Sequence, residues 1–394
     1  MTVSDKVAGY LKRMPVSPFY AILDYVVDLG LQKEAVYLNM GEPHFDTPIH
    51  IREAAKKALD GGYTAYTPQP GIFQLREAIA EKLKRENGIE VDPKTEVFVT
   101  NGAQAAVYVA LKTLIDPGDE VIVPSPYYPP YVINTEILGG KPIIIPFDLR
   151  DDLTLEPEEF EKHINEKTKA IFIHSPNNPI GGVISEENLK AISEVALRHR
   201  IPVVTDECYE KILFDGVKHT SVASLPGMKD LTLTISSFSK SYSMTGWRVG
   251  YLAAEASFVK SFAKIHHTIN ICVNSVAQWA AYAALTGPHD FMDKWQKVYE
   301  TNRGIILEAL EKSDVTKLAV RPTGTFYVFL DITKLGMSSE VAVRFFVREA
   351  GVVLTPGSGF GSYGEGYVRM SFATQTENVE KAISRLVEVL EKSS

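Results

Sequence analysis

Apolar positions between residues 95 and 254 fall into short, unbroken runs separated by stretches with helical spacing. The runs are rich in β-branched residues and lie at 96–100, 120–123, 142–146, 170–174, 202–205, 231–236 and 249–253. Helices are expected between them, most clearly at 103–114 and 185–199. Strands that are apolar on both faces are typical of a sheet covered by helices on both sides. The pattern predicts an α/β fold with a mainly parallel sheet, whose ligand site lies beyond the carboxyl ends of its strands.

The pattern changes after residue 255. A long helix is expected through 280–312, followed by strands at 326–330, 352–354 and 367–371 and a closing helix at 377–391. Strands interleaved with helices in this way predict a smaller α+β domain. The start of the chain looks irregular and amphipathic, and we expect it to pack on that domain. The predicted division is an N-terminal segment 1–45, a large domain 46–284 and a small domain 285–394.

Composition supports this division and excludes some classes of function. A chain of 394 residues is too long for one ordinary core. Its net charge of −8 argues against nucleic-acid binding, which needs a basic face. Two cysteines without metal-ligand spacing exclude a disulfide framework and predict no metal site. With neither a secretory signal nor an apolar run of the roughly 20 residues that cross a bilayer, we expect a cytoplasmic protein with no membrane partner.

A lysine lies just past one of the predicted strands, in the sequence SSFSK at residues 236–240. Desolvation disfavours the charged form of a lysine, so Lys240 in a dry crevice can lose its proton and form a Schiff base. Taken alone, such a lysine is more often a surface residue in a polar turn. Its neighbours along the sheet edge decide between the two interpretations.

Asp206 directly follows the predicted strand at 202–205 and is expected at the same sheet edge. A buried carboxylate needs a cationic partner, and a protonated pyridine nitrogen is one. Three residues further on, Tyr209 can reach the same ligand from the following turn. The alternative for Asp206 is a helix cap or a solvent-facing position.

Two more turns follow predicted strands. The loop SPNNPIG at 175–181 carries Asn178, which offers both a donor and an acceptor, although an ordinary Asx turn fits equally well. The segment TNGAQ at 100–104 is a strand end, a glycine turn and a helix start. Free amides at a helix start bind anions, and Gly102 lets a phosphate approach the backbone. Arg248, with its planar fork, can supply the countercharge, and simple turn chemistry is the alternative.

Together these motifs, in this order, resemble the fold-type I aminotransferases, the aspartate/aromatic aminotransferase family of class I and II. The likeness extends to GEPHFDTP at 41–48 and to YVRMSFA at 367–373, so it covers nearly the whole chain. It implies pyridoxal 5'-phosphate as cofactor, Lys240 as the Schiff-base lysine and proton shuttle, and Asp206 as the partner of the pyridine nitrogen. It also implies that Asn178 and Tyr209 bind the phenolic oxygen of the cofactor.

The resemblance assigns the remaining site residues as well. It implies a phosphate site made of Ser237, Arg248 and the amides of Gly102, Ala103 and Gln104, and a ring of Tyr128 stacked on the pyridine. Tyr66 resembles the tyrosine that reaches the phosphate of a partner subunit, which implies a homodimer. Arg369, Gly41 and Asn178 resemble the residues that bind the substrate carboxylate, for which a bidentate arginine is suited.

The implied reaction is a ping-pong transfer of an amino group from an L-amino acid to a 2-oxo acid, with 2-oxoglutarate as the expected acceptor. A carbon–sulfur lyase or another elimination enzyme shares the same motifs and is the alternative. A ligand-sensing regulator of this fold would carry an added DNA-binding segment, and none is expected here.

Substrate preference depends on few positions. Ala103 stands where some prokaryotic relatives place a lysine that contacts a second carboxylate, which removes one route to acidic substrates. Phe19, Tyr20 and Phe360 either line an apolar side-chain pocket or belong to the core, and the sequence leaves both open.

Other residues with reactive or metal-binding side chains are expected to have structural roles. Tyr127 and Tyr131 are expected in the core, and Cys208 as a small buried filler beside the crevice. His266 and His267 lack a third metal ligand at useful spacing and are expected to be a partly buried helical pair.

Overall fold

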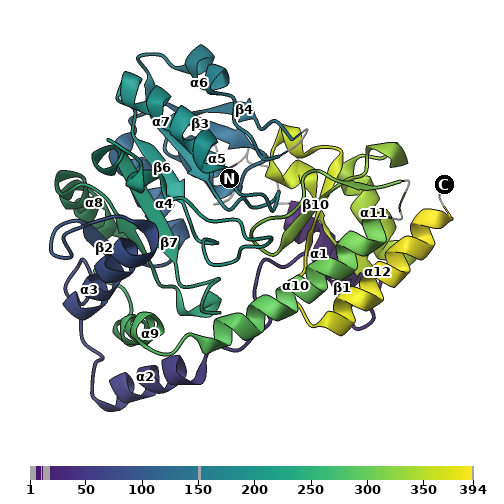
Figure 1. The fold of residues 1–394 in the computed structure, drawn as a ribbon, viewed down its shortest axis with the longest axis horizontal. Helices are drawn as coiled ribbons and strands as arrows, with labels where there is room; N and C mark the ends of the chain where they lie inside the picture. Colours follow the sequence, from purple (N-terminus) through teal and green to yellow (C-terminus); the bar gives the residue numbers. More distant parts are fainter. Residues whose placement is uncertain are drawn as a thin grey trace.

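The computed structural model describes residues 6–9, 11, 18–149, 152–311, 313 and 315–392. Their strands form sheets of seven, four and two strands, and helices pack around them (Figure 1). The predicted α/β class, with a mainly parallel sheet and a smaller α+β part built from both ends of the chain, is confirmed.

The seven-stranded sheet has the order β2, β8, β7, β6, β5, β3, β4. Its strands are β2 (Val97–Thr100), β3 (Glu120–Ser125), β4 (Lys141–Pro146), β5 (Thr168–His174), β6 (Val203–Asp206), β7 (Thr232–Ser237) and β8 (Gly250–Ala253). Neighbours from β7 to β4 are parallel, whereas β8 runs antiparallel to both β2 and β7. The carboxyl ends of the other strands therefore meet at one edge, together with the beginning of β8.

Alternate residues of the central strands face opposite layers of helices. Ile171 and Ile173 of β5 pack in one apolar cluster with α7 (Glu186–His199), and Phe172 packs in another with α4 (Ala103–Leu114). The two-residue period of a strand produces this division. Both layers are apolar, which explains the unbroken runs in the sequence.

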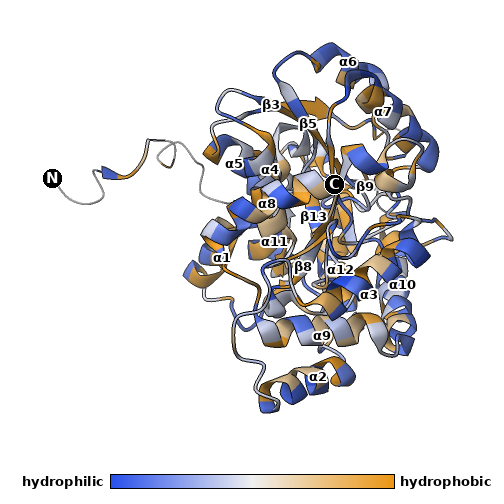
Figure 2. Cartoon of the chain, turned by 90° about the vertical axis from the view of Figure 1, so that its left-hand side faces the viewer, coloured by the Kyte–Doolittle hydropathy of each residue, from blue (hydrophilic) through white to orange (hydrophobic). Residues whose placement is uncertain are grey.

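The remaining helices of this part surround the same sheet. They are α2 (Ile49–Asp60), α3 (Phe73–Lys82), α5 (Pro130–Ile137), α6 (Pro157–His163), α8 (Ala256–Ile269) and α9 (Ser275–Thr286). Figure 2 shows hydrophilic and hydrophobic positions alternating along α6 and α7, as expected for helices with one face against the core.

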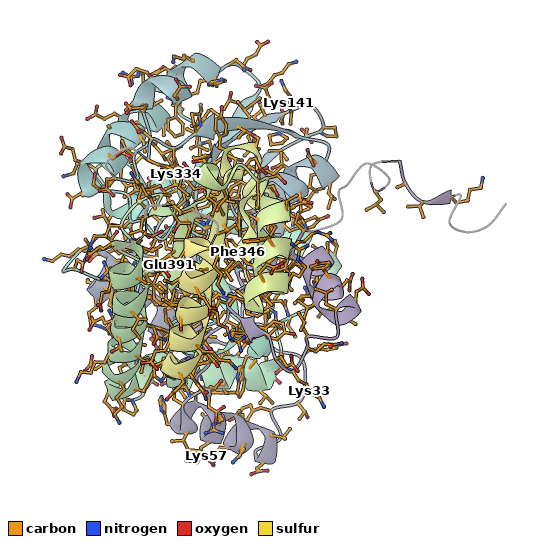
Figure 3. The ribbon with its side chains drawn as sticks, turned by 90° about the vertical axis from the view of Figure 1, so that its right-hand side faces the viewer. Lys33, Lys57, Lys141, Lys334, Phe346 and Glu391 are labelled. Atoms are coloured by element: carbon orange, nitrogen blue, oxygen red, sulfur yellow. The ribbon has the colours of Figure 1, made fainter. Side chains whose placement is uncertain are left out.

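The four-stranded sheet has the order β12, β13, β10, β9, and β1 pairs in parallel with β11. These strands are β1 (Val36–Tyr37), β9 (Lys317–Leu318), β10 (Tyr327–Asp331), β11 (Val352–Val353), β12 (Thr355–Pro356) and β13 (Tyr367–Ser371). Helices α1 (Pro18–Asp28), α10 (Asp290–Glu311), α11 (Ser339–Ala350) and α12 (Thr376–Glu391) pack around them. Lys334 and Glu391, labelled in Figure 3, are exposed, whereas Phe346 of α11 is buried.

Two expectations for these elements were wrong. The single helix expected through 280–312 is interrupted at Gly287 and Pro288, so that α9 and α10 are separate helices. A proline disfavours helical geometry in the residue before it, which ends α9 here. Residue 312 lies outside the described residues.

The start of the chain is also more regular than expected, because it contains α1 and β1. Helix α1 contacts α11, and β1 pairs with β11. Residues 1–5, 10 and 12–17 of the predicted N-terminal segment lie outside the described residues, and the domain boundaries stay predictions. No helix in the described ranges is long and apolar enough to span a membrane.

Candidate active site

The carboxyl edge of the seven-stranded sheet borders a cavity of about 660 Å³. It is closed on its other side by residues of β10, β12, β13 and the segment before α2. The predicted site residues that line it are Gly41, Ala103, Gln104, Tyr128, Asn178, Asp206, Tyr209, Ser237, Lys240, Arg248 and Arg369. Segments that are far apart in the sequence thus meet in one place.

Lys240 lies three residues beyond β7, and its Nζ donates a hydrogen bond to the carbonyl of Gly41 at 2.5 Å. Burial lowers the pKa of Lys240 to about 8, and the charges of Arg369 and Arg248 act in the same direction. Cys208 and Glu42 oppose this shift. A lysine with this pKa is partly neutral near pH 7, and a neutral amine is both a nucleophile and a base.

Asp206 is the last residue of β6 and is buried. Its Oδ1 accepts a hydrogen bond from the backbone amide of Cys208 at 3.1 Å. Its Oδ2 accepts one from the hydroxyl of Tyr131 at 2.8 Å. Among the described residues, no cationic side chain forms an ion pair with Asp206, which leaves its charge available to a ligand.

Tyr131 was expected in the core, and it is buried and stacked on Phe172 at 4.5 Å between ring centroids. The expected core position of Tyr131 is confirmed, and its hydroxyl in addition donates a hydrogen bond to Asp206. His174 was missed altogether. It ends β5 directly beside Asp206 and lines the cavity, and burial lowers its pKa. Its position at a strand end, next to the strand of Asp206, was the available signal.

An anion-binding site lies where β2 passes into α4. Gly102 has a φ of +83°, and α4 begins immediately after it without a side-chain cap. The guanidinium of Arg248 lies against it, since a Cβ at position 102 would come within 2.6 Å of Nη2. Arg248 lies two residues before β8, the antiparallel strand, and therefore reaches the same edge as the strand ends. Free helix amides and a guanidinium together fit a phosphate.

Arg369, in the middle of β13, is buried and faces the cavity. Its Nη1 donates to Oδ1 of Asn178 at 2.8 Å, and its Nη2 donates to the carbonyl of Asn39 at 2.7 Å. Within the described part of the chain, its buried Nε has no hydrogen-bond partner. A strand arginine with an open donor in a cavity is suited to a carboxylate.

Tyr128 lines the cavity, and burial, together with the charge of Asp206, raises its pKa to about 12. Tyr66 does not line the cavity of its own chain, and 78% of it is exposed.

Cys208 lines the cavity as well, and burial raises the pKa of its thiol well above the usual value, which keeps it protonated. His266 is buried in α8, whereas His267 is exposed.

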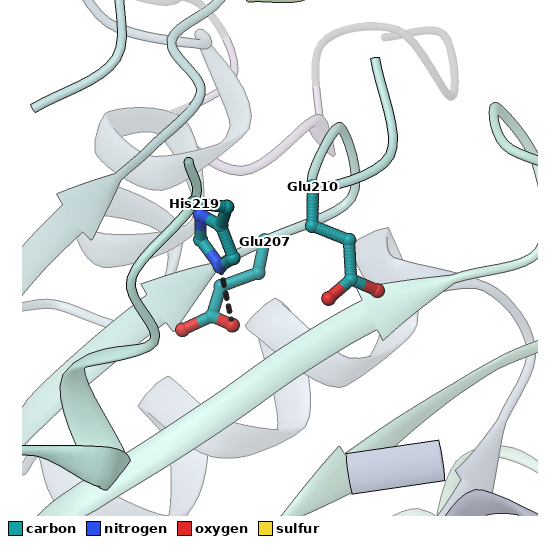
Figure 4. A group of neighbouring side chains, drawn as sticks. All are labelled: Glu207, Glu210 and His219. Atoms are coloured by element: carbon teal, nitrogen blue, oxygen red, sulfur yellow. Dashed lines mark hydrogen bonds and ion pairs between the residues drawn. The ribbon is translucent and has the colours of Figure 1, made fainter. Parts of the chain in front are cut away.

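Behind the cavity, Glu207, Glu210 and His219 form the one group of three ligand-type side chains close enough to hold a metal ion among the described residues (Figure 4). His219 Nε2 lies 3.0 Å from Glu207 Oε2, and this carboxylate raises the pKa of His219 despite burial. Lys82, the last residue of α3, forms an ion pair with Glu210. Lys82 and His219 thus provide each of the two carboxylates with a basic partner inside the chain, and the group forms an ion-pair network.

The model of one protein family, described as aminotransferase class I and II, matches residues 33–386 of this chain. The chain is an aminotransferase of this family. Family members use pyridoxal phosphate and act on amino acids and 2-oxo acids. The match includes every strand of the three sheets and all the residues that line the cavity except Pro18, Phe19 and Tyr20.

Individual relatives agree with the family assignment. Aromatic-amino-acid aminotransferase 2 of Thermococcus litoralis is 40% identical over 359 residues, which is 91% of this chain and 92% of the relative. The aspartate aminotransferase of Pyrococcus abyssi is 40% identical over 360 residues, with the same coverage. The crystal structure of an aromatic aminotransferase from Pyrococcus horikoshii matches with a TM-score of 0.88 at 39% identity, covering 93% of this chain and 99% of that one. These names favour transamination over the carbon–sulfur lyase alternative.

Proposed function

We propose that this aminotransferase binds pyridoxal phosphate in the cavity through Lys240 and transfers the amino group of L-amino acids with apolar side chains to a 2-oxo acid, with 2-oxoglutarate as the acceptor. One observation carries the proposal. The low-pKa amine of Lys240 and the carboxylate of Asp206, which forms no ion pair with a cationic side chain in the described part of the chain, line the same cavity.

The residues present fit each end of the cofactor. Arg248, the amides that begin α4 and the hydroxyl of Ser237 would hold its phosphate. Asp206 would pair with the ring nitrogen, with Tyr131 fixing the carboxylate. Asn178 and Tyr209 would bind the phenolic oxygen, and Tyr128 would stack on the ring.

When bound, pyridoxal phosphate supplies the electron sink for breaking a bond at the substrate Cα. Nζ of Lys240, as a free amine, would take the proton from the substrate Cα and hold it for return. Its pKa near 8 suits both steps, because a base works best when its pKa lies near the operating pH. Arg369 holds the substrate carboxylate and so restricts which bond at Cα faces Lys240.

The cations of the cavity limit the substrate side chain. Lys240, Arg248 and Arg369 are the lysine and arginine side chains that line it within the described residues. Each has a proposed role with the cofactor or the α-carboxylate, so none is left for a second carboxylate. Phe19, Tyr20 and Phe360, for which the sequence left two interpretations open, all line the cavity, together with Val107, Pro130 and Ile133. This composition supports an apolar or aromatic side chain.

A homodimer is part of the proposal. Tyr66 is exposed and does not line the cavity of its own chain, so a second copy can contact it. Other large apolar residues that are exposed lie in the same or neighbouring segments: Met40, Ile49, Tyr63, Phe73, Ile269 and Ile271. Ser275 donates a hydrogen bond to the carbonyl of Tyr63, which brings two of these segments together. A second copy covering this surface would remove apolar area from water.

A panel of amino donors tests the substrate class. With 2-oxoglutarate as acceptor and glutamate formation as the readout, phenylalanine, tyrosine or leucine should give a kcat/KM at least about tenfold above that of aspartate, because the pocket lacks a second cation. Release of pyruvate and ammonia from cystathionine, measured in parallel, should stay at background. Aspartate as the best donor would contradict the proposed substrate class, and elimination as the faster reaction would contradict the proposed transfer.

A further inference from the structure

Tyr327 lines the cavity, and the sequence did not indicate that it would. It begins β10 and is buried. Arg369, on the neighbouring strand β13, lies diagonally across from it, since Tyr327 pairs with Ser371 and Arg369 pairs with Phe329. Diagonal neighbours on adjacent strands lie on the same face of a sheet, and both side chains line the cavity.

The ring and the hydroxyl of Tyr327 make separate contacts. The guanidinium carbon of Arg369 lies 4.4 Å from the centre of the ring, a cation–π distance. The hydroxyl lies 2.9 Å from the hydroxyl of Tyr209. Gly41 packs so closely that a Cβ there would come within 2.3 Å of the Tyr327 oxygen. One residue therefore contacts the proposed carboxylate site and the proposed cofactor site.

The direction of the bond between the two phenols follows from their hydrogens. Burial raises the pKa of both Tyr209 and Tyr327, so both stay protonated and each has one hydrogen to donate. If Tyr209 gives its hydrogen to the phenolic oxygen of the cofactor, it has none left for Tyr327. Tyr327 must then be the donor. Donation to Tyr209 polarises that hydroxyl and strengthens its own hydrogen bond.

We propose that Tyr327 is a positioning residue, whose hydroxyl orients and strengthens Tyr209 as a donor to the cofactor while its ring supports Arg369. The inference rests on the proposed function, because it needs the cofactor in this cavity. It adds a connection between the strand that binds the substrate carboxylate and the turn that binds the cofactor.

Tyr327→Phe tests the hydroxyl and keeps the ring. In this variant Tyr209 would be a weaker donor than in the wild type, and the ionised phenolic oxygen of the cofactor would lose stabilisation. The pH midpoint of the visible absorbance change of the bound cofactor should rise by about half to one unit. The kcat should fall about threefold to tenfold, whereas the KM for the amino acid should change less than about twofold, because the ring still lies under Arg369.

Tyr299→Phe is the matched control. Tyr299, on α10, is buried in the same apolar cluster as Tyr327, and its hydroxyl has no hydrogen-bond partner among the described residues. The same substitution there should leave the midpoint and the kcat unchanged. A merely structural role of Tyr327 would lower the melting temperature of its variant without moving the midpoint.

The possible results separate the two proposals. A visible absorbance in the wild type, with an unmoved midpoint in Tyr327→Phe, overturns the positioning role alone. Equal shifts in Tyr327→Phe and Tyr299→Phe overturn it as well. A wild-type chain that gains no visible absorbance with pyridoxal phosphate contradicts the proposed function, and the inference falls with it.

Discussion

At the scale of single residues, the chemistry depends on a lysine that burial makes less basic. Nζ of Lys240 donates to one backbone carbonyl, that of Gly41, and two arginines line the same cavity. Burial and these positive charges both favour the neutral amine. The amine is thereby prepared to react with an aldehyde at a pH where an exposed lysine is almost fully protonated.

The first prediction at this scale concerns the pH dependence of cofactor capture. Because only the neutral amine attacks an aldehyde, the rate at which the cofactor-free chain captures pyridoxal phosphate should rise about tenfold per pH unit below the pKa. It should level off above pH about 8. Stopped-flow absorbance measures this rate. A rate that kept rising up to the pKa of an ordinary lysine would show that Lys240 is not perturbed.

At the scale of elements, the end of β6 and the turn after it carry side chains with two different roles. Asp206 and Tyr209 face the cavity, whereas Glu207 and Glu210 belong to the buried ion-pair network behind it. Burial lowers the pKa of Lys82, but the charge of Glu210, the hydrogen bond to it and the charges of Tyr251 and Glu86 together outweigh this effect, and the pKa lies above its usual value. Asn87 joins the network by donating to Glu210 Oε2 and to Ser221 Oγ, at 2.7 Å each. Through Lys82, helix α3 is thereby tied to the turn after β6, which carries the proposed cofactor ligand Tyr209.

Lys82→Met should therefore lower the free energy of unfolding by about 3 to 5 kcal/mol, since it leaves Glu210 buried without its cation. The double variant Lys82→Met/Glu210→Gln removes both charges and should recover most of this loss. Lys84→Met is the control, because Lys84 forms an exposed ion pair with Glu90, and its loss should barely change the free energy of unfolding. Denaturant unfolding measures the free energy of unfolding of all three variants. Equal losses of this free energy in Lys82→Met and Lys84→Met would contradict a structural role of the network.

At the scale of the whole molecule, the cavity lies where the large sheet meets the four-stranded sheet. Asn39, Asn178 and Arg369 come from three distant parts of the chain and are joined by hydrogen bonds. The first and last parts of the chain therefore contribute Asn39 and Arg369 to the site at the edge of the large sheet. The proposed second copy would complete the site through Tyr66.

Much of this arrangement follows from the sequence. Buried runs predicted the strands, and the rule that ligands bind at strand ends brought Lys240, Asp206 and Asn178 to one edge. Tyr327 could not be found in this way, because it begins a strand of the other sheet and reads as part of an apolar run. The sequence predicts Tyr131 in the core, where it lies, and only the packing of α5 against the sheet brings its hydroxyl to Asp206. Such contacts depend on packing between elements, which local patterns do not encode.

The central claim is that Lys240 carries the cofactor, and one comparison tests it most directly. Wild-type chain and Lys240→Ala, both confirmed to be folded by circular dichroism, are mixed with pyridoxal phosphate, and visible absorbance and glutamate formation are measured after removal of free cofactor. The wild type should retain the absorbance and form glutamate, whereas the variant should retain neither. A Lys240→Ala chain that still transaminated at the wild-type rate would contradict the account.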